Sequence, residues 1–160
     1  MTKVYDDALS TSTIYAAENN VTAMVERGGA VEFFGSTLDL RQCAVRTYTP
    51  DQLPLLQGMV TGLYGTYRYG VREQAPTIRI SPRAYRRAWY SPGVHEIVLP
   101  GARWAWNDMV LCHEIAHAAS GCGHDARSAH GKAWRAIYAA MVAEVVGPEA
   151  GLLLQAAFDL

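Results

Sequence analysis

The chain has 160 residues, of which half are hydrophobic and 18% are charged, and its net charge at pH 7 is -1. This length and composition fit one globular domain that buries a core without disulfide staples, and they exclude a disordered chain. The near-zero net charge excludes a protein that binds polyanions through its overall charge. We therefore expect a single domain over residues 1–160, in which residues 1–12 form a flexible polar lead-in.

The cysteines and the N-terminal sequence indicate the cellular compartment in which we expect the protein. Cys43, Cys112 and Cys122 are odd in number and lack C-x-x-C spacing, so we expect no disulfide framework. A reduced, cytoplasmic protein is the default for such a chain. Residues 1–10 lack the charge pattern of a signal peptide, and no apolar run has the length of a membrane span, so we expect no membrane association.

The first predicted element is a helix whose apolar side chains recur at helical spacing from Ile14 to Val25. We place Glu18 and its polar neighbours on the opposite face of this helix, which Gly28-Gly29 ends. Two extended segments follow, the first over 30–40 with a bend near Gly35-Ser36 and the second over 44–49. A helix then starts at 51–53 and runs through Leu63, and a Gly/Tyr loop over 64–70 comes after it. The next elements are a strand over 77–81, a polar connection over 82–93 and a strand over 95–99.

The most informative stretch is His113-Glu114-Ile115-Ala116-His117, which matches the pattern H-E-x-x-H. On a helix, residues four apart lie on one face about 6 Å apart along the axis, so both histidines can bind one zinc ion. Glu114 lies beside them and can reach a metal-bound water without being a ligand, as a zinc hydrolase requires. The alternative is a buried helix whose histidines are satisfied by hydrogen bonds.

Local signals place this motif on a helix that begins between Trp104 and Asn107, with Asn107 as its N-cap, and ends near Ser120-Gly121. Cys112, one residue before the first histidine, is expected to pack in the core. Three elements complete the chain: a loop over 122–129, a helix opened by His130-Gly131 and ended by Gly147-Pro148, and a short apolar helix over 149–160.

A catalytic zinc ion takes three protein ligands and keeps one position open for water. The candidates for the third ligand are His124, His130, Cys122 and a distal acid such as Glu144. The metzincin spacing H-E-x-x-H-x-x-G-x-x-H would require Gly at 120 and His at 123, whereas the sequence has Ser120 and Gly123. The spacing therefore argues against that class and leaves the third ligand open.

The segment His130-Gly-Lys-Ala-Trp134 resembles the SprT-like zinc metallopeptidases, in which an H-G-x-x-aromatic segment after the motif supplies the third ligand. Over more of its length the chain is similar to a family of small metallohydrolases of actinobacteria and their phages, on Ile14-Tyr-Ala-Ala-Glu18 and Val146-Gly-Pro-Glu-Ala150. The resemblance implies a zincin-like fold, one zinc ion, and His130 as third ligand with His124 as the second choice. We see no zinc ribbon or DNA-binding extension, so a DNA-directed function does not carry over.

We therefore predict an α+β domain with a small, mixed, twisted sheet, packed helices and the H-E-x-x-H helix at its centre. The predicted function is zinc-dependent hydrolysis of peptide bonds in a peptide or protein substrate. His113, His117 and His130 would hold zinc, while Glu114 would be the general base that takes a proton from a zinc-activated water. Tyr138 could donate to the transition-state oxyanion, but it fits an apolar helix stripe and is expected to pack in the core.

Two other functions are open at this point. One is a metal-dependent amidase that acts on a non-peptide substrate. The other is a non-catalytic module with zinc closed by four protein ligands, His124 or Cys122 included, that binds nucleic acid or a partner protein. That module would use residues 68–103, the arginine-rich segment, which holds seven arginines, two glutamates and interleaved aromatic residues. This composition is typical of single-stranded nucleic-acid surfaces and also of a solvated rim beside a cleft, and we favour the rim.

Overall fold

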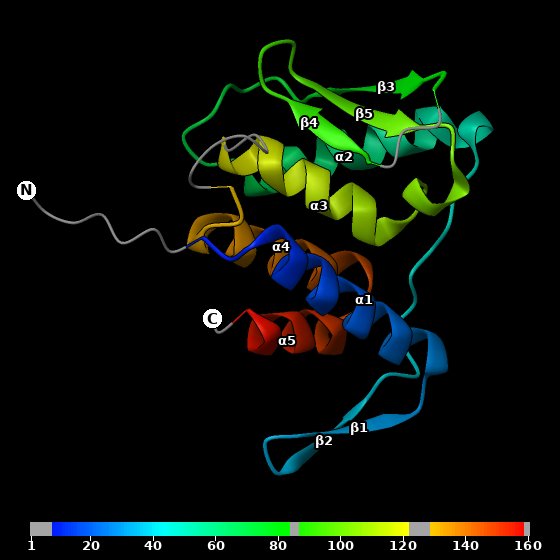
Figure 1. Ribbon diagram of the computed structural model, residues 1–160, viewed down its shortest axis with the longest axis vertical. Helices are drawn as coiled ribbons and strands as arrows, with labels where there is room; N and C mark the ends of the chain where they lie inside the picture. Colours follow the sequence, from blue (N-terminus) through cyan, green and yellow to red (C-terminus); the bar gives the residue numbers. More distant parts are fainter. Residues whose placement is uncertain (1–7, 84–86, 122–128, 159–160) are drawn as a thin grey trace, which may run out of the picture.

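The computed structural model of the chain describes residues 8–83, 87–121 and 129–158. These residues form a mixed α+β structure, as predicted, with a small sheet at one end and helices packed beside it (Figure 1). The helices are α1 (Thr11–Arg27), α2 (Leu53–Tyr67), α3 (Asp108–Ser120), α4 (Lys132–Val145) and α5 (Pro148–Ala157), and the strands are β1 (Ala30–Phe33), β2 (Ser36–Asp39), β3 (Thr77–Ser81), β4 (Trp89–Ser91) and β5 (Glu96–Pro100). α2 and α3 lie next to the sheet of β3, β4 and β5, and α4, α1 and α5 lie beyond α3 (Figure 1).

The larger sheet has the strand order β3-β5-β4, in which β3 is parallel and β4 antiparallel to β5. The strand predicted over 77–81 is confirmed as β3, and the strand predicted over 95–99 is confirmed as β5, shifted by one residue. β4 corrects the prediction, because it lies in the segment expected to be a polar connection over 82–93. It is three residues long, so the alternating pattern that identifies a strand has no room to repeat.

The segment over 44–49 is a second correction, because it forms no strand and makes only an isolated bridge between Thr47 and Asn107. Hydrogen bonds to a buried carboxylate hold this segment in place instead of strand pairing. Asp108, fully buried at the start of α3, accepts hydrogen bonds from the Arg46 backbone N–H at 2.8 Å and from the Tyr48 hydroxyl. Burial and the neighbouring Asp108 raise the pKa of Tyr48. These bonds fix the segment against the first turn of α3.

α1 starts earlier and α2 ends later than predicted. α1 begins at Thr11 behind Ser10, whose side chain caps the first turn, so residues 11 and 12 of the expected lead-in are helical. It ends at Gly28, as predicted, where the backbone has a φ of 65°. α2 continues through Tyr67, so the loop expected over 64–70 is wrong in its first half. The buried Tyr64 extends the apolar face of this helix, which outweighs the loop-like composition.

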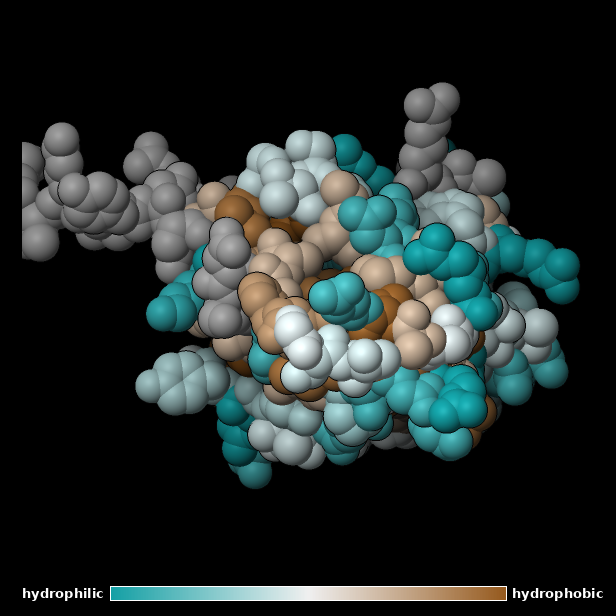
Figure 2. Space-filling view, turned by 90° about the horizontal axis from the view of Figure 1, so that it is seen from below, coloured by the Kyte–Doolittle hydropathy of each residue, from teal (hydrophilic) through white to brown (hydrophobic). Residues whose placement is uncertain are grey.

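β1 and β2 form an antiparallel hairpin at the end of the molecule opposite the larger sheet (Figure 1). The predicted bend is confirmed, since Phe34 and Gly35 in the two-residue turn have φ angles of 48° and 78°. Three side chains of the hairpin pack against the core: Val31, Phe33 and Leu38. Seen from this end, apolar residues gather around the middle of the visible face, with a hydrophilic group among them, and many residues towards the edge of the face are hydrophilic (Figure 2).

α3 carries the H-E-x-x-H motif and is buried over most of its length. The Asn107 side chain caps it, as predicted, by accepting a hydrogen bond from the Val110 backbone N–H at 3.0 Å. The helix ends at Ser120 before Gly121, which has a φ of 73°. Cys112 packs in the core as expected, and burial raises the pKa of its thiol. Within the described part of the chain, none of the helices has the length and apolar character required to cross a membrane.

The contact between α4 and α5 depends on a glycine. A Cβ atom added to Gly151 would lie 2.4 Å from the Cβ of Ala143. The overpacking in Gly151→Ala is therefore expected to lower the free energy of unfolding by about 1–3 kcal/mol, which thermal denaturation would measure. Gly62→Ala on the exposed side of α2 is the matched control, because nothing lies within 4 Å of its added Cβ. It should be neutral or stabilise by up to about 1 kcal/mol, and equal losses in both variants would contradict the prediction.

Candidate metal centre

The structure brings together the three histidines that the sequence selects as ligands. His113 and His117 lie on α3, and His130 lies two residues before the start of α4. The Nε2 atom of His113 is 3.2 Å from that of His117 and 3.4 Å from that of His130. All three side chains are buried, and each offers a ligand atom within 4.8 Å of the others. The three histidines are therefore close enough to bind one metal ion.

His130 is held in an unusual backbone conformation by its neighbours. Its φ of 62° lies in the left-handed region, which costs a residue other than glycine about 1–3 kcal/mol. Its carbonyl oxygen accepts hydrogen bonds from the Arg135 guanidinium at 2.8 Å and from the Leu9 backbone N–H at 3.3 Å. Contacts from α4 and from the segment before α1 therefore fix the position of this imidazole.

Trp134 packs against the whole histidine cluster. Its ring centroid lies 4.7 Å from that of His113, 5.1 Å from His117 and 4.6 Å from His130. Its indole N–H donates a hydrogen bond to the His113 carbonyl oxygen at 3.3 Å. This buried tryptophan is the aromatic residue of the H-G-x-x-aromatic segment, and it forms an apolar wall on one side of the cluster.

Glu114 lies beside the cluster without joining it. Its Oε1 atom is 4.0 Å from the Nε2 atom of His113, and its side chain is buried. Among the described residues, the group that could hold a metal ion consists of the three histidines. Glu114 also lines a pocket, together with His113. Its carboxylate is therefore placed to exchange a proton with a molecule that approaches the histidine nitrogens from this pocket.

The pocket beside Glu114 has a volume of about 130 Å³ and a mainly apolar lining. The side chains that line it besides His113 and Glu114 are Tyr15, Glu18, Arg87, Ala88, Trp104 and Val110. They come from α1, from the segment before β4, from the short helix Arg103–Ala105 and from α3. Burial and, to a smaller extent, the nearby carboxylates raise the pKa of Tyr15. The pocket therefore offers an apolar cavity next to a buried acid and the histidine cluster.

Glu18 is the site residue that the sequence prediction misplaced. Its side chain is 13% exposed, and its Oε1 atom is hydrogen-bonded to Nδ1 of His113, so its assignment to the polar face of α1 is wrong. At about 100° per residue, it lies about 40° from Ile14 and about 20° from Val25 around the helix. Burial lowers the pKa of His113, but the carboxylates of Glu18 and, to a smaller extent, Glu114 more than offset this, and that pKa is raised.

Other residues named from the sequence do not join the cluster or cannot be placed. His124 and Cys122 lie outside the described residues. The Glu144 carboxylate accepts a hydrogen bond from the Tyr67 hydroxyl at 2.7 Å and is not part of the histidine group. Tyr138 is fully buried, and its hydroxyl donates to the Met109 carbonyl oxygen at 3.4 Å, which agrees with a core position. Burial raises its pKa well above the ordinary value.

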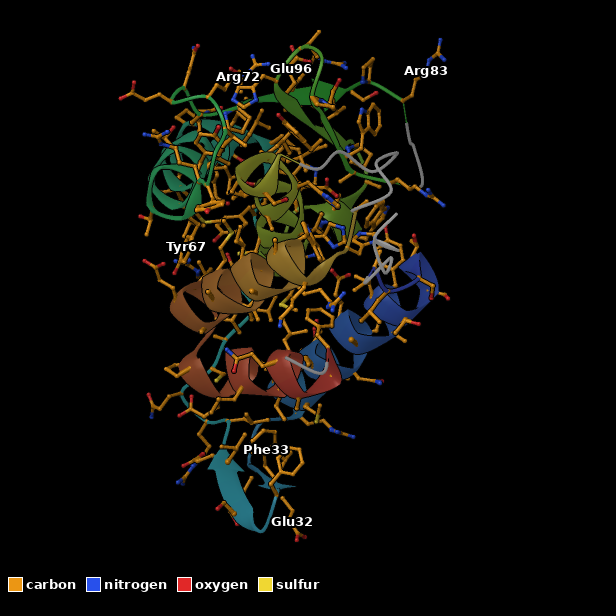
Figure 3. All side chains as sticks on the ribbon, turned by 90° about the vertical axis from the view of Figure 1, so that its left-hand side faces the viewer. Glu32, Phe33, Tyr67, Arg72, Arg83 and Glu96 are labelled. Carbon is orange, nitrogen blue, oxygen red and sulfur yellow. The ribbon has the colours of Figure 1, made fainter. Side chains whose placement is uncertain are left out.

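Four arginines of the arginine-rich segment can be placed in the structure from their contacts or their labels. Arg72 and Arg83 lie on opposite sides of the sheet end of the molecule (Figure 3). Arg79 forms an ion pair with Glu96, with 2.9 Å between Nε and Oε2. Arg87 is exposed and lines the pocket beside the cluster. Of these arginines, Arg79 is therefore paired within the sheet, and Arg87 lies at the pocket beside the histidine cluster.

Comparisons with protein families, with curated proteins and with solved structures find no match to this chain. The resemblance to SprT-like peptidases therefore stays a prediction from the motifs. The functional assignment depends on the geometry of the histidine cluster, Glu114 and the pocket.

Proposed function

We propose that this protein is a zinc-dependent hydrolase that cleaves peptide bonds, with His113, His117 and His130 as the zinc ligands. The main support for this proposal is the distance between the ligand nitrogen atoms. Zn–N bonds of about 2.0–2.1 Å at tetrahedral angles put two ligand nitrogens about 3.3–3.4 Å apart. The observed Nε2 separations of 3.2 and 3.4 Å fit this value. Three imidazoles are also a known donor set of catalytic zinc, which leaves one position open.

In this proposal zinc, when bound, supplies a Lewis acid that polarises the substrate carbonyl and makes water a stronger acid. The protein's own contribution is proton transfer and exclusion of solvent. Glu114 takes the proton of the attacking water and delivers it to the leaving amine. Trp134 shields the histidines, and the low-dielectric surroundings of the buried carboxylate strengthen its interaction with developing charge.

The pocket favours a catalytic over a structural metal site. A structural zinc site is closed by four protein ligands, whereas a catalytic one keeps an open position next to a space for substrate. Here a pocket of about 130 Å³ reaches both His113 and Glu114. The zincin-like arrangement predicted from the sequence belongs to the same proposal.

The edge strand favours a peptide as substrate. β4 pairs with β5 on one side and lies at the end of the strand order, in contact with α3. An edge strand can pair with an extended peptide through backbone hydrogen bonds, which would align a scissile bond along the cleft. The segment just before β4 contributes Arg87 and Ala88 to the same pocket that Glu114 lines.

The pocket should set the preference for one substrate side chain. Val110→Phe fills part of the apolar cavity, so we expect kcat/KM to fall about 10- to 200-fold for peptides with Leu or Phe next to the scissile bond. Peptides with Gly or Ala there should lose much less. Steady-state kinetics on a matched peptide set would measure this, with Val94→Phe, an exposed site, as control. An equal loss for all peptides would contradict a role in specificity.

A fluorogenic peptide library tests the function itself. The zinc-loaded protein should hydrolyse members of the library, lose the activity with 1,10-phenanthroline and regain it with added zinc. Cleavage of non-peptide amides alone would favour the amidase alternative. Stoichiometric zinc with no hydrolysis of either class would contradict the enzymatic proposal.

A further inference from the structure

α1 reaches the metal site from a distant part of the sequence. Glu18 lies 95 positions before His113, and its Oε1 atom is hydrogen-bonded to Nδ1 of that histidine. Tyr15, almost one turn earlier on α1, stacks on the same imidazole, with ring centroids 5.9 Å apart and planes 7° from parallel. α1 therefore contacts both the edge and the face of the His113 ring.

The hydrogen bond to Glu18 determines which nitrogen of His113 can bind a metal. An ionised carboxylate only accepts hydrogen bonds, so Nδ1 of His113 donates its proton and Nε2 keeps its lone pair. Nε2 is the atom that lies 3.2 Å from Nε2 of His117 and 3.4 Å from Nε2 of His130. The ring is therefore held in the tautomer and orientation that a metal ligand requires.

Glu18 is placed by packing on the core side of its helix. It lies between the directions of Ile14 and Tyr15, and only 13% of its side chain is exposed. Besides burial, the charge of the same carboxylate contributes to the raised pKa of Tyr138 on α4. Burying an acid costs solvation free energy unless hydrogen bonds offset it, and the bond to His113 on α3 contributes to this. The carboxylate thus joins α1 to α3 on the side of the His113 ring that carries Nδ1.

We propose that Glu18 is a positioning residue of the metal site, whose carboxylate accepts the Nδ1–H of His113 and holds Nε2 towards the metal. It is not a ligand, because it contacts the other nitrogen of the ring and lies outside the group of three histidines. The inference rests on the zinc site of the proposed function and is independent of hydrolysis. It also means that the affinity for the metal depends on the packing of α1 against α3.

The zinc affinity of the full chain, measured by competition with a chromophoric chelator, tests this proposal. Glu18→Gln keeps the size of the side chain but removes its charge, and Glu18→Ala removes the acceptor. Zinc binding should weaken about 10- to 100-fold, with the larger loss in Glu18→Ala, because partners of this kind orient the ligand and raise its basicity. Glu26→Gln, exposed on the same helix, is the matched control and should bind zinc like the wild type.

A second readout separates positioning from a loss of folding. In the zinc-loaded wild type, the Nδ1–H proton of His113 should give a downfield proton resonance that moves upfield in Glu18→Gln and disappears in Glu18→Ala. Zinc affinities of both variants equal to that of Glu26→Gln, with zinc bound by the wild type, would overturn the proposal and leave the proposed function intact. A wild type that binds no zinc would overturn both.

Discussion

Glu114→Gln is expected to keep its zinc and to lose about 10²- to 10⁴-fold in kcat for peptide hydrolysis, the usual contribution of a general base. The amide cannot take a proton from the attacking water, whereas the three histidines are unchanged. Because Glu114 is buried, the nearly equal size of glutamine avoids a cavity that would confuse the result. Zinc content by mass spectrometry and kcat on one fluorogenic peptide, from the same preparation, would check both halves of the prediction.

Glu32→Gln is the matched control for this exchange. Glu32 is exposed on the hairpin, at the opposite end of the molecule from the sheet (Figure 3), so its zinc content and kcat should equal those of the wild type. A Glu114→Gln protein with full zinc and the wild-type rate would refute the role of Glu114 as base. Loss of zinc together with activity would instead place Glu114 among the groups that hold the metal.

Elements with strong local signals are predictable from this sequence. Asn107 before α3 and Gly121 after it determine the ends of that helix, because each satisfies backbone groups that the helix leaves unpaired. β3 is found over 77–81 since five residues suffice to show alternation. β4 is missed because its pairing with β5, a tertiary contact, defines it more than its own three residues do.

The helical period of α1 indicates the buried position of Glu18, whereas its polarity indicates the opposite face. Sorting residues by polarity puts an acid on the solvent side, whereas the helical period puts Glu18 within about 40° of both Ile14 and Val25, on the core side. An acid at an apolar position of a helix conflicts with the local pattern, and such conflicts tend to mark functional sites. The sequence cannot, however, name its partner, because His113 meets Glu18 only in the folded chain.

The third ligand could not be chosen from spacing alone, because local rules do not determine the path of a loop. His124 and His130 follow His117 by seven and thirteen residues, and either could return to the motif. Tertiary contacts place His130 in the cluster. Its backbone has a φ of 62°, and its carbonyl oxygen accepts hydrogen bonds from Arg135 and Leu9. The preference for His130 over His124 therefore comes from the resemblance to a known motif and not from the length of the loop.

His130→Ala is expected to release the zinc ion, because it leaves only two of the three nitrogens of the cluster. The zinc affinity should fall by more than about 100-fold, the upper end of what loss of an outer-shell partner costs. Zinc at 100 times its dissociation constant stabilises a protein by about 2.7 kcal/mol, so the wild type should gain this much in free energy of unfolding and His130→Ala almost nothing. Zinc content and chemical denaturation with and without zinc would measure the two effects.

His124→Ala is the matched control, because it removes the other histidine that follows the motif and so distinguishes loss of a ligand from loss of any histidine. If the three histidines of the cluster are the complete ligand set, His124→Ala should keep stoichiometric zinc and the full stabilisation. Zinc lost in His124→Ala but kept in His130→Ala would move the third ligand to position 124. Zinc lost in both would indicate a site with four protein ligands, which has no open position and would argue for a structural metal in place of a hydrolase.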